Sequence, residues 1–309
     1  MSKIMFRLSL LATALAGALH ATAAQAQPIR AYLSLTGADA NPCTFAMPCK
    51  SAQHAHDVVA AGGEIRMLDP GSYGLVTINK AISILGDGHG GIAAQSGATA
   101  ITINAGPTDT ITLRGVIVQG FGTGSTGIVF NTGGTLDLQD CLIRNFTGDG
   151  IDFFPTASSK YVISDTIVAD NGGRGIYVAP KVAGAANGTI TGVRASNNAN
   201  NGIFVDGQFS NGAASVLEIV SSVAVGNQIS GVAAQSSFMS IVARDTAAIN
   251  NGFSGFTTIG SAVMRLAGTV VTGNGQGVTS VGSIDTYGDN QIIGNGTDIA
   301  ATLTPVTAD

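Results

Sequence analysis

A glycine followed by an apolar residue recurs every 22 to 29 residues from residue 127 onward, and this repeat limits the possible folds more than any other feature. The seven pairs are Gly127-Ile128, Gly150-Ile151, Gly175-Ile176, Gly202-Ile203, Gly231-Val232, Gly255-Phe256 and Gly277-Val278. Units of this length, holding short alternating strands broken by Gly and Asn bends, are typical of the coils of a β-solenoid. The repeat therefore predicts an all-β chain that forms one solenoid.

An asparagine recurs in the same units, shortly before the glycine. The series is Asn171, Asn198, Asn227, Asn251, Asn274 and Asn295. Asparagine tolerates the left-handed backbone that a tight bend requires, and stacked Asn side chains can hydrogen-bond from coil to coil. We therefore expect an asparagine ladder along the solenoid axis.

With these repeats, the chain resembles the right-handed parallel β-helix, or pectin-lyase-like, superfamily from about Gly63 to about Ile299. The right-handed winding is implied by this resemblance and by the rule for parallel crossover connections. We expect β-helix coils and the C-terminal end to occupy residues 63–309.

An N-terminal cap is predicted over residues 27–62. Residues 51–61 place Ala52, Ala55, Val58 and Val59 at helical spacing, with Ser51 as N-cap and Gly62 as the stop. Because a solenoid exposes strand edges and core at its ends, this short amphipathic helix is expected to plug the first coil. The order of cysteine loop, helix and strand resembles the N-terminal cap of bacterial secreted β-helix proteins.

Two of the three cysteines are predicted to form a disulfide. Cys43 and Cys49 share the short loop NPCTFAMPC, which suits a local bond. Cys141 lies in a strand-like run and is interpreted as a buried free thiol.

The first residues predict a secretory signal peptide over residues 1–26. Basic Lys3 and Arg7 precede an apolar run over residues 8–19, and Ala24-Gln25-Ala26 forms a cleavage signature after Ala26. We expect a secreted protein, periplasmic or extracellular, with no membrane span.

The charge balance argues against nucleic acid as a partner. Removing Lys3 and Arg7 from 14 basic residues leaves 12 against 19 acidic residues, a formal net charge of −7. Phosphate backbones require clustered Lys and Arg, which are absent here.

Outward side chains of the strands that begin at the Gly-apolar pairs form the candidate ligand-binding set. By strand alternation these are Asp152, Phe154, Tyr177, Phe204 and Asp206. Since parallel coils stack about 4.8 Å apart, Asp152, Tyr177 and Phe204 are expected to form one column. Carboxylates and aromatic rings on one face suit a sugar ligand.

Loops of increased length follow these outward residues, at residues 155–160, 180–189 and 207–215. They could form one wall of a binding groove. Alternatively, they could fold over the aromatic rings and bury them without any ligand.

Catalytic motifs are weak. Gly88-His89-Gly90 is similar to an element of polygalacturonases, whose other motifs are absent, so His89 is interpreted as a turn residue.

Pectate lyases use acidic calcium ligands with an Arg or Lys base. Residues of both kinds lie near one another here: Arg144, Lys160, Arg174 and Lys181, with Asp149, Asp152 and Asp170. His54 and His56 point to different sides of a helix, and no metal or cofactor is predicted.

Three functions remain open. The first is a non-catalytic secreted β-helix, monomeric, that engages a polysaccharide or a cell-surface partner along its face. The alternative is a polysaccharide lyase, glycoside hydrolase or epimerase acting on an acidic polysaccharide. The third is a purely structural surface repeat.

Overall fold

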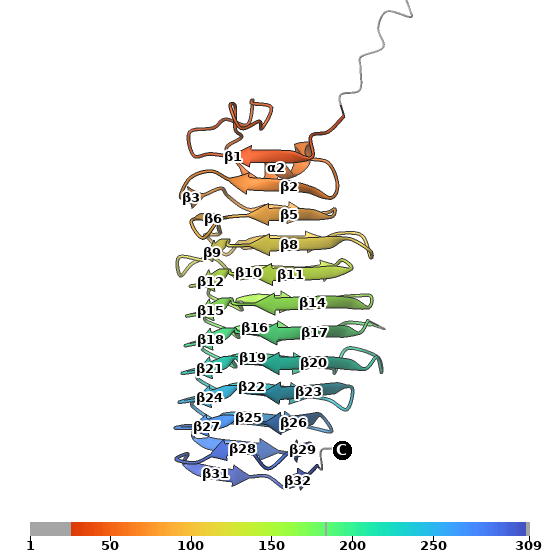
Figure 1. Cartoon of the computed structure of the whole chain (residues 1–309), viewed down its shortest axis with the longest axis vertical. Coiled ribbons are helices and arrows are strands. Elements are labelled where there is room, and N and C mark those ends of the chain that lie inside the picture. The colour runs from red at the N-terminus through yellow and green to blue at the C-terminus, as the bar shows by residue number, and fades with distance from the viewer. Residues whose placement is uncertain (1–25, 183, 307–309) are drawn as a thin grey trace, which may run out of the picture.

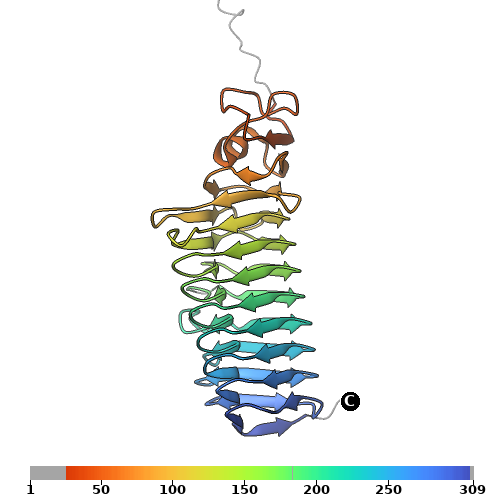
Figure 2. The ribbon, with the colours of Figure 1, turned by 90° about the vertical axis from the view of Figure 1, so that its left-hand side faces the viewer.

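The computed structural model describes residues 26–182 and 184–306. The chain winds into a column of stacked coils, in which each coil contributes one strand to each of three parallel sheets (Figures 1 and 2). The described residues include one helix, α2 (Ala52–Val58). The all-β solenoid predicted from the repeat is confirmed. Apart from Ala26, the predicted signal peptide lies outside the described residues.

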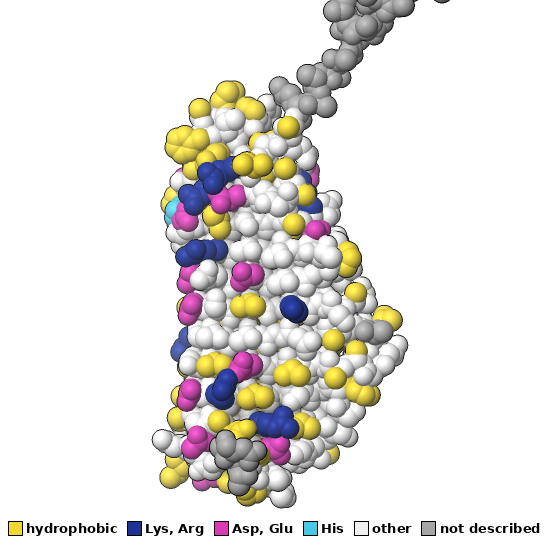
Figure 3. Space-filling model, turned by 45° about the vertical axis from the view of Figure 1, so that its right-hand side comes forward, with side chains coloured by type: hydrophobic (Ala, Val, Ile, Leu, Met, Phe, Trp, Pro, Cys, Tyr) yellow, Lys and Arg dark blue, Asp and Glu magenta, His cyan; other side chains and the backbone are white. Residues whose placement is uncertain are grey.

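Sheet A contains 12 parallel strands and runs the full height of the column. They are β1 (Arg30–Leu33), β2 (Gly63–Met67), β5 (Ile82–Leu85), β8 (Thr110–Arg114), β11 (Thr135–Gln139), β14 (Ser159–Ser164), β17 (Ala186–Thr191), β20 (Ser215–Val220), β23 (Met239–Arg244), β26 (Val263–Ala267), β29 (Ser283–Thr286) and β32 (Leu303–Pro305). Figure 3 shows basic and acidic side chains interspersed on this side of the molecule, where Arg30 and Arg66 pair with Glu64, and Arg265 with Asp285.

Sheet B contains ten shorter strands. They are β3 (Gly71–Ser72), β6 (Gly90–Ala93), β9 (Ile117–Gln119), β12 (Leu142–Arg144), β15 (Ile167–Ala169), β18 (Arg194–Ser196), β21 (Val223–Val225), β24 (Ala247–Ile249), β27 (Val270–Thr272) and β30 (Gln291–Ile292). A tight bend leads from each later strand of sheet A into sheet B, and residues such as Asp165 adopt positive φ there.

Sheet C also contains ten strands, most of which begin at or beside the Gly-apolar pairs. They are β4 (Val76–Ile78), β7 (Thr99–Asn104), β10 (Thr126–Thr132), β13 (Ile151–Phe153), β16 (Ile176–Val178), β19 (Ile203–Asp206), β22 (Val232–Gln235), β25 (Ser254–Ile259), β28 (Gln276–Ser280) and β31 (Thr297–Ala300). The register places Ile128, Ile151, Ile176 and Ile203 directly above one another, all buried. Because stacked aliphatic columns of this kind fill the interior, the core runs along the axis of the column.

The predicted asparagine ladder is confirmed between sheets B and C. From Asn171 to Asn295, each Nδ2 donates to the Oδ1 of the next asparagine at 2.9 Å. The backbone N–H of each donates to the same oxygen at 2.8–3.3 Å. The ladder ends where Asn295 donates to Asp298. These bonds satisfy buried amides that the bend would otherwise leave unpaired.

The expected left-handed backbone falls one residue earlier than the ladder. Asp170, Asn197 and Asn250 have φ values of 56°, 54° and 53°, whereas the ladder asparagines that follow them have negative φ. The ladder asparagine is therefore selected for its amide rather than for its tolerance of positive φ.

The repeating glycine is required by close approach to the ladder. A Cβ on Gly202 would lie 2.7 Å from Nδ2 of Asn227 and 2.8 Å from the carbonyl oxygen of Gly231. Since real Cβ atoms essentially never approach this closely, any side chain at Gly202 would displace the ladder of the next coil.

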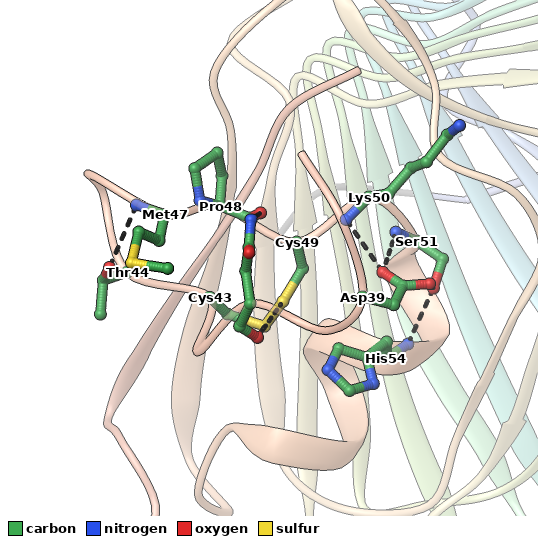
Figure 4. The surroundings of a disulfide bond; sticks show 10 residues. Asp39, Cys43, Thr44, Met47, Pro48, Cys49, Lys50, Ser51 and His54 are labelled. Atoms are coloured by element: carbon green, nitrogen blue, oxygen red, sulfur yellow. Dashed lines mark hydrogen bonds between the residues drawn. A yellow bond between two sulfur atoms is a disulfide. The ribbon is translucent and has the colours of Figure 1, made fainter. Parts of the chain in front are cut away.

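The N-terminal end of the column is covered by β1, α2 and the cysteine loop. Cys43 and Cys49 form a disulfide, as predicted. Asp39 joins the loop to the helix, because its carboxylate accepts from the backbone N–H of Lys50 and Ser51 at 2.9 and 2.8 Å and from the Ser51 hydroxyl at 2.7 Å (Figure 4).

Helix α2 is shorter than the predicted 51–61. Ser51 is its N-cap, accepting from the N–H of His54 at 3.3 Å, but the helix ends at Val58. Val59 is extended instead and turns its side chain into the core. Ala52 and Ala55 are buried as expected, and His56 is buried with them. No helix in residues 26–182 and 184–306 is long and apolar enough to cross a bilayer.

Candidate functional site

The predicted column of outward residues lies on sheet C. Asp152 of β13 pairs in register with Tyr177 of β16, which pairs with Phe204 of β19. Phe154 follows β13, and Asp206 ends β19. Strand alternation thus brings all five predicted residues to one face of three consecutive coils.

The aromatic rings of this column contact one another. Tyr177 stacks on Phe204 with centroids 5.4 Å apart and an interplanar angle of 9°, and it meets Phe154 edge-on at 5.1 Å. Two cations lie on these rings: the Arg174 guanidinium is 4.1 Å from the Tyr177 centroid, and Lys181 Nζ is 4.7 Å from that of Phe154. The site is a cluster of aromatic rings with two cations, rather than a row of separate rings.

Phe204 is not the exposed platform that alternation predicts. Only 6% of it is accessible, because Tyr177 covers one part of the ring and the Arg174 guanidinium lies 5.2 Å from its centroid. Asp152 and Asp206 are buried as well, at 8% and 4% accessible. Tyr177 and Phe154 remain half-buried, so they are the rings that a ligand could reach.

The carboxylates near the rings are held in different ways. Asp149 pairs with Arg174 Nη1 at 3.3 Å. Asp206 accepts from the Tyr177 hydroxyl at 3.3 Å and from the backbone N–H of Gln208 at 2.9 Å. Burial, with the charge of Asp206 as a second cause, raises the pKa of Tyr177 to about 12. Tyr177 is therefore a neutral hydrogen-bond donor at physiological pH.

Asp152 has the most unusual protonation in the cluster. Burial, followed by the neighbouring carboxylate of Asp149, raises its pKa to about 8, although Arg174 and Lys181 act in the opposite direction. Oδ1 of Asp152 and Nε of Arg174 are buried without a hydrogen-bond partner among the described residues. A carboxyl group of this kind can store and transfer a proton near neutral pH.

A cavity of about 640 Å³ opens beside the rings. Its lining comprises Phe154, Tyr177, Ala179, Lys181, Val182, Gln208, Phe209 and Asn211. The last residues come from the loops of increased length, whose apolar side chains Val182 and Phe209 are 57% and 55% exposed. The loops thus form a wall of the cavity and leave Tyr177 partly accessible.

Some residues grouped by the sequence do not join the site. Arg144 lies on β12 of sheet B and donates to Gln119, Lys160 lies on β14 of sheet A, and Asp170 bonds Asn197 in the ladder bend. Of the four basic residues grouped by the sequence, only Arg174 and Lys181 reach the aromatic cluster. Gln208, Phe209 and Asn211 were not predicted individually, and loop length was the only signal for them.

Within the described residues, potential metal ligands lie close together where the cysteine loop meets helix α2. Ligand atoms of Cys43, Cys49 and His54 lie within 4.8 Å of one another (Figure 4). Because the two sulfurs form a disulfide, they are not free thiolates that could bind a metal.

The fold and the repeat define a class of protein. A family model described as "Right handed beta helix region" matches residues 69–215 and 100–296. The chain therefore belongs to the right-handed β-helix family, as its resemblance to that family implied.

Solved structures share the fold at low sequence identity. Pectate lyase Pel9A is 15% identical, with a TM-score of 0.60 over 83% of this chain and 74% of its own. The A-module of the Azotobacter vinelandii mannuronan C-5 epimerase AlgE4 is 20% identical, with a TM-score of 0.63 over 78% and 72%. The enzymatically active domain of bacteriophage CBA120 tailspike protein 2 is 13% identical, with a TM-score of 0.54 over 82% and 46%. No curated protein matches the sequence.

Proposed function

We propose that this chain is an exported β-helix protein that binds a polysaccharide on the outer face of sheet C, at the cavity beside Tyr177. The cavity carries the proposal, because the Tyr177 and Phe154 rings and the Lys181 ammonium line one open space of about 640 Å³. Sugar rings stack on aromatic faces, and their hydroxyls bond to amides such as Gln208 and Asn211. The names of two structural neighbours, a pectate lyase and a mannuronan epimerase, support a polysaccharide ligand.

Replacing Tyr177 tests this proposal. Tyr177→Ala should remove binding to every glycan that wild type retains on a glycan array, while the melting temperature falls by only a few degrees, because the ring is half-buried. Tyr177→Phe keeps the ring and should keep most of the binding. Tyr287→Ala, which removes a tyrosine that is 42% exposed outside the cavity, is the matched control. Absence of any wild-type hit, or full binding by Tyr177→Ala, would refute the proposal.

Export is part of the proposal. The disulfide between Cys43 and Cys49 suits an oxidising compartment. Protein recovered from the periplasm or the medium of an expressing bacterium should begin at Gln27 by mass spectrometry. Recovery of uncleaved chain from the cytoplasm alone would contradict it.

Asp152 supports a second candidate function, catalysis on an acidic polysaccharide. Its pKa of about 8 suits proton transfer, and Arg174 and Tyr177 beside it could contact a uronate. Wild type incubated with pectate and mannuronan should then generate unsaturated ends, reducing ends or C-5-epimerised residues, and Asp152→Asn should not. Binding without any such product would leave the non-catalytic function as the better one.

A further inference from the structure

A second cavity lies on the same face of sheet C, nearer the C-terminus. It has a volume of about 400 Å³, and every side chain in its lining is uncharged. Thr257 and Thr279 lie on its floor, and Phe253, Ile259 and Val281 rise around it, exposed by 54%, 38% and 81%. This is an open, uncharged surface with hydroxyls at its base.

The two threonine hydroxyls on the floor are connected to each other and to the hydroxyl of the buried Ser254. Thr279 Oγ1 donates to Thr257 Oγ1 at 2.7 Å, and Ser254 Oγ lies 3.0 Å from the Thr279 hydroxyl. A hydroxyl has one hydrogen and two lone pairs, so Thr257 and Thr279, which line the cavity, keep acceptor capacity for a neutral hydroxyl ligand, whereas Ser254 is fully buried.

The two cavities belong to one continuous column of strands. Register pairs connect Tyr177 to Phe204, Phe204 to Ala233, Ala233 to Thr257 and Thr257 to Thr279. Four interstrand steps of about 4.8 Å span roughly 19 Å. An extended glycan lying along the axis could therefore occupy both cavities.

Charge divides this column into two parts. Lys181 lines the first cavity, Arg174 lies on the Tyr177 ring beside it, and Asp152 and Asp206 are buried in the same cluster, whereas the lining of the second cavity contains no ionisable group. A sugar carboxylate over the second cavity would lose hydration without meeting a cation, which is unfavourable. Over the first cavity it would meet Lys181, which joins no ion pair in the part of the chain that the structure describes.

We infer that the ligand is a heteropolysaccharide, with an anionic sugar beside Lys181 and Arg174 and neutral sugars over Phe253, Thr257 and Thr279. This rests on the proposed polysaccharide function and narrows it. A homopolymer of uronate residues matches only the first cavity.

Titration calorimetry of the full chain with three hexasaccharides tests the inference. The probes are hexagalacturonate, an alternating rhamnose–galacturonate hexamer and neutral galactohexaose. The alternating probe should bind about tenfold more tightly than either of the others, because it alone complements both cavities. Phe253→Ala should weaken binding of the alternating probe about tenfold and leave binding of hexagalacturonate unchanged. Gln276→Lys, which places a cation in the second cavity, should strengthen binding of hexagalacturonate.

Phe121→Ala is the matched control, because Phe121 is 56% exposed and lines a different cavity. It should not change binding of any probe. Hexagalacturonate binding as tightly as the alternating probe, or an equal effect of Phe253→Ala on both, would overturn the inference but leave polysaccharide binding intact. Failure of all three probes to bind would overturn the inference together with the proposed function.

Discussion

Burial gives Asp152 a protonation equilibrium that can be observed near neutral pH. Its pKa in the fold is about 8, chiefly through loss of hydration and then through Asp149. In the unfolded chain an aspartate titrates near about pH 4. Between these two pKa values the folded state holds a proton that the unfolded state releases. The contribution of Asp152 to the stability of wild type therefore falls as the pH rises from about 4 to about 8.

Asp152→Asn removes this loss of stability with rising pH, since the amide never ionises. Relative to wild type, the variant should gain up to about 1.4 kcal/mol of stability per pH unit between about pH 4 and pH 8, with no further gain above that. Urea denaturation of both proteins across this range measures the difference. Asp137→Asn, which changes a half-buried aspartate on the outer face of sheet A, is the control variant. A pH-independent difference for Asp152→Asn would show that the carboxyl is not perturbed.

At this scale, the sequence predicted the column but left open whether its side chains are buried or exposed. The two-residue period and the coil spacing place Asp152, Tyr177 and Phe204 in register, because both depend only on local backbone geometry. Whether Phe204 is exposed depends on Arg174, which lies 30 positions before it and reaches across the coil. Contacts of this kind depend on rotamers and loop paths, which a residue pattern does not encode.

Among the structural elements, the asparagine ladder is a cooperative unit. Asn227 accepts from Asn198 and donates to Asn251 and to the carbonyl oxygen of Ala195, all buried. Asn227→Ala should reduce the free energy of unfolding by about 2 to 4 kcal/mol, because a buried donor left unpaired costs about 1 to 3 kcal/mol. Asn295→Ala, at the half-buried end where water can replace the amide, should reduce it by less. Equal losses in urea denaturation would argue against the ladder as a source of stability.

The disulfide is the second element whose contribution can be isolated. Cys43→Ser should reduce the free energy of unfolding by about 2 to 4 kcal/mol, because the bond restricts the unfolded loop and fixes the cap. The double variant with Cys49→Ser should lose no more than this, since the same bond is absent. Mass spectrometry of untreated wild type should find one free thiol, Cys141, whose pKa burial raises to about 11. Three free thiols would show that the bond does not form.

Element boundaries were less predictable than element types. Helical spacing in the cap continues to Val59, yet the helix ends at Val58. Val59 is fully buried in an extended conformation, so tertiary packing outweighs local periodicity at that point. The ladder was predictable because its asparagines repeat with the coils, whereas the single turn at the end of α2 has no repeat to reveal it.

At the scale of the molecule, the two ends of the column differ (Figure 1). The first strand of sheet C, β4, and the last, β31, each pair with one neighbouring strand. Helix α2 packs against β4, where Val76 and Ile78 are buried. Side chains of β31 are mostly exposed, and within the described residues no strand continues sheet C beyond it. Since each coil of a solenoid is stabilised mainly by its neighbours, local stability should decline toward β31.

Hydrogen exchange measured by mass spectrometry tests this asymmetry. Amides of β31 should exchange at least about tenfold faster than those of β4, although both are terminal strands, because only β4 is covered. Strands β16 and β19, with neighbours on both sides, should exchange more slowly than either. Cys43→Ser should accelerate exchange in β4 and leave β31 unchanged, since loosening the cap affects only the adjacent coils. If β4 and β31 exchange equally in wild type, the cap does not protect the first coil, and the sheet alone determines stability at both ends.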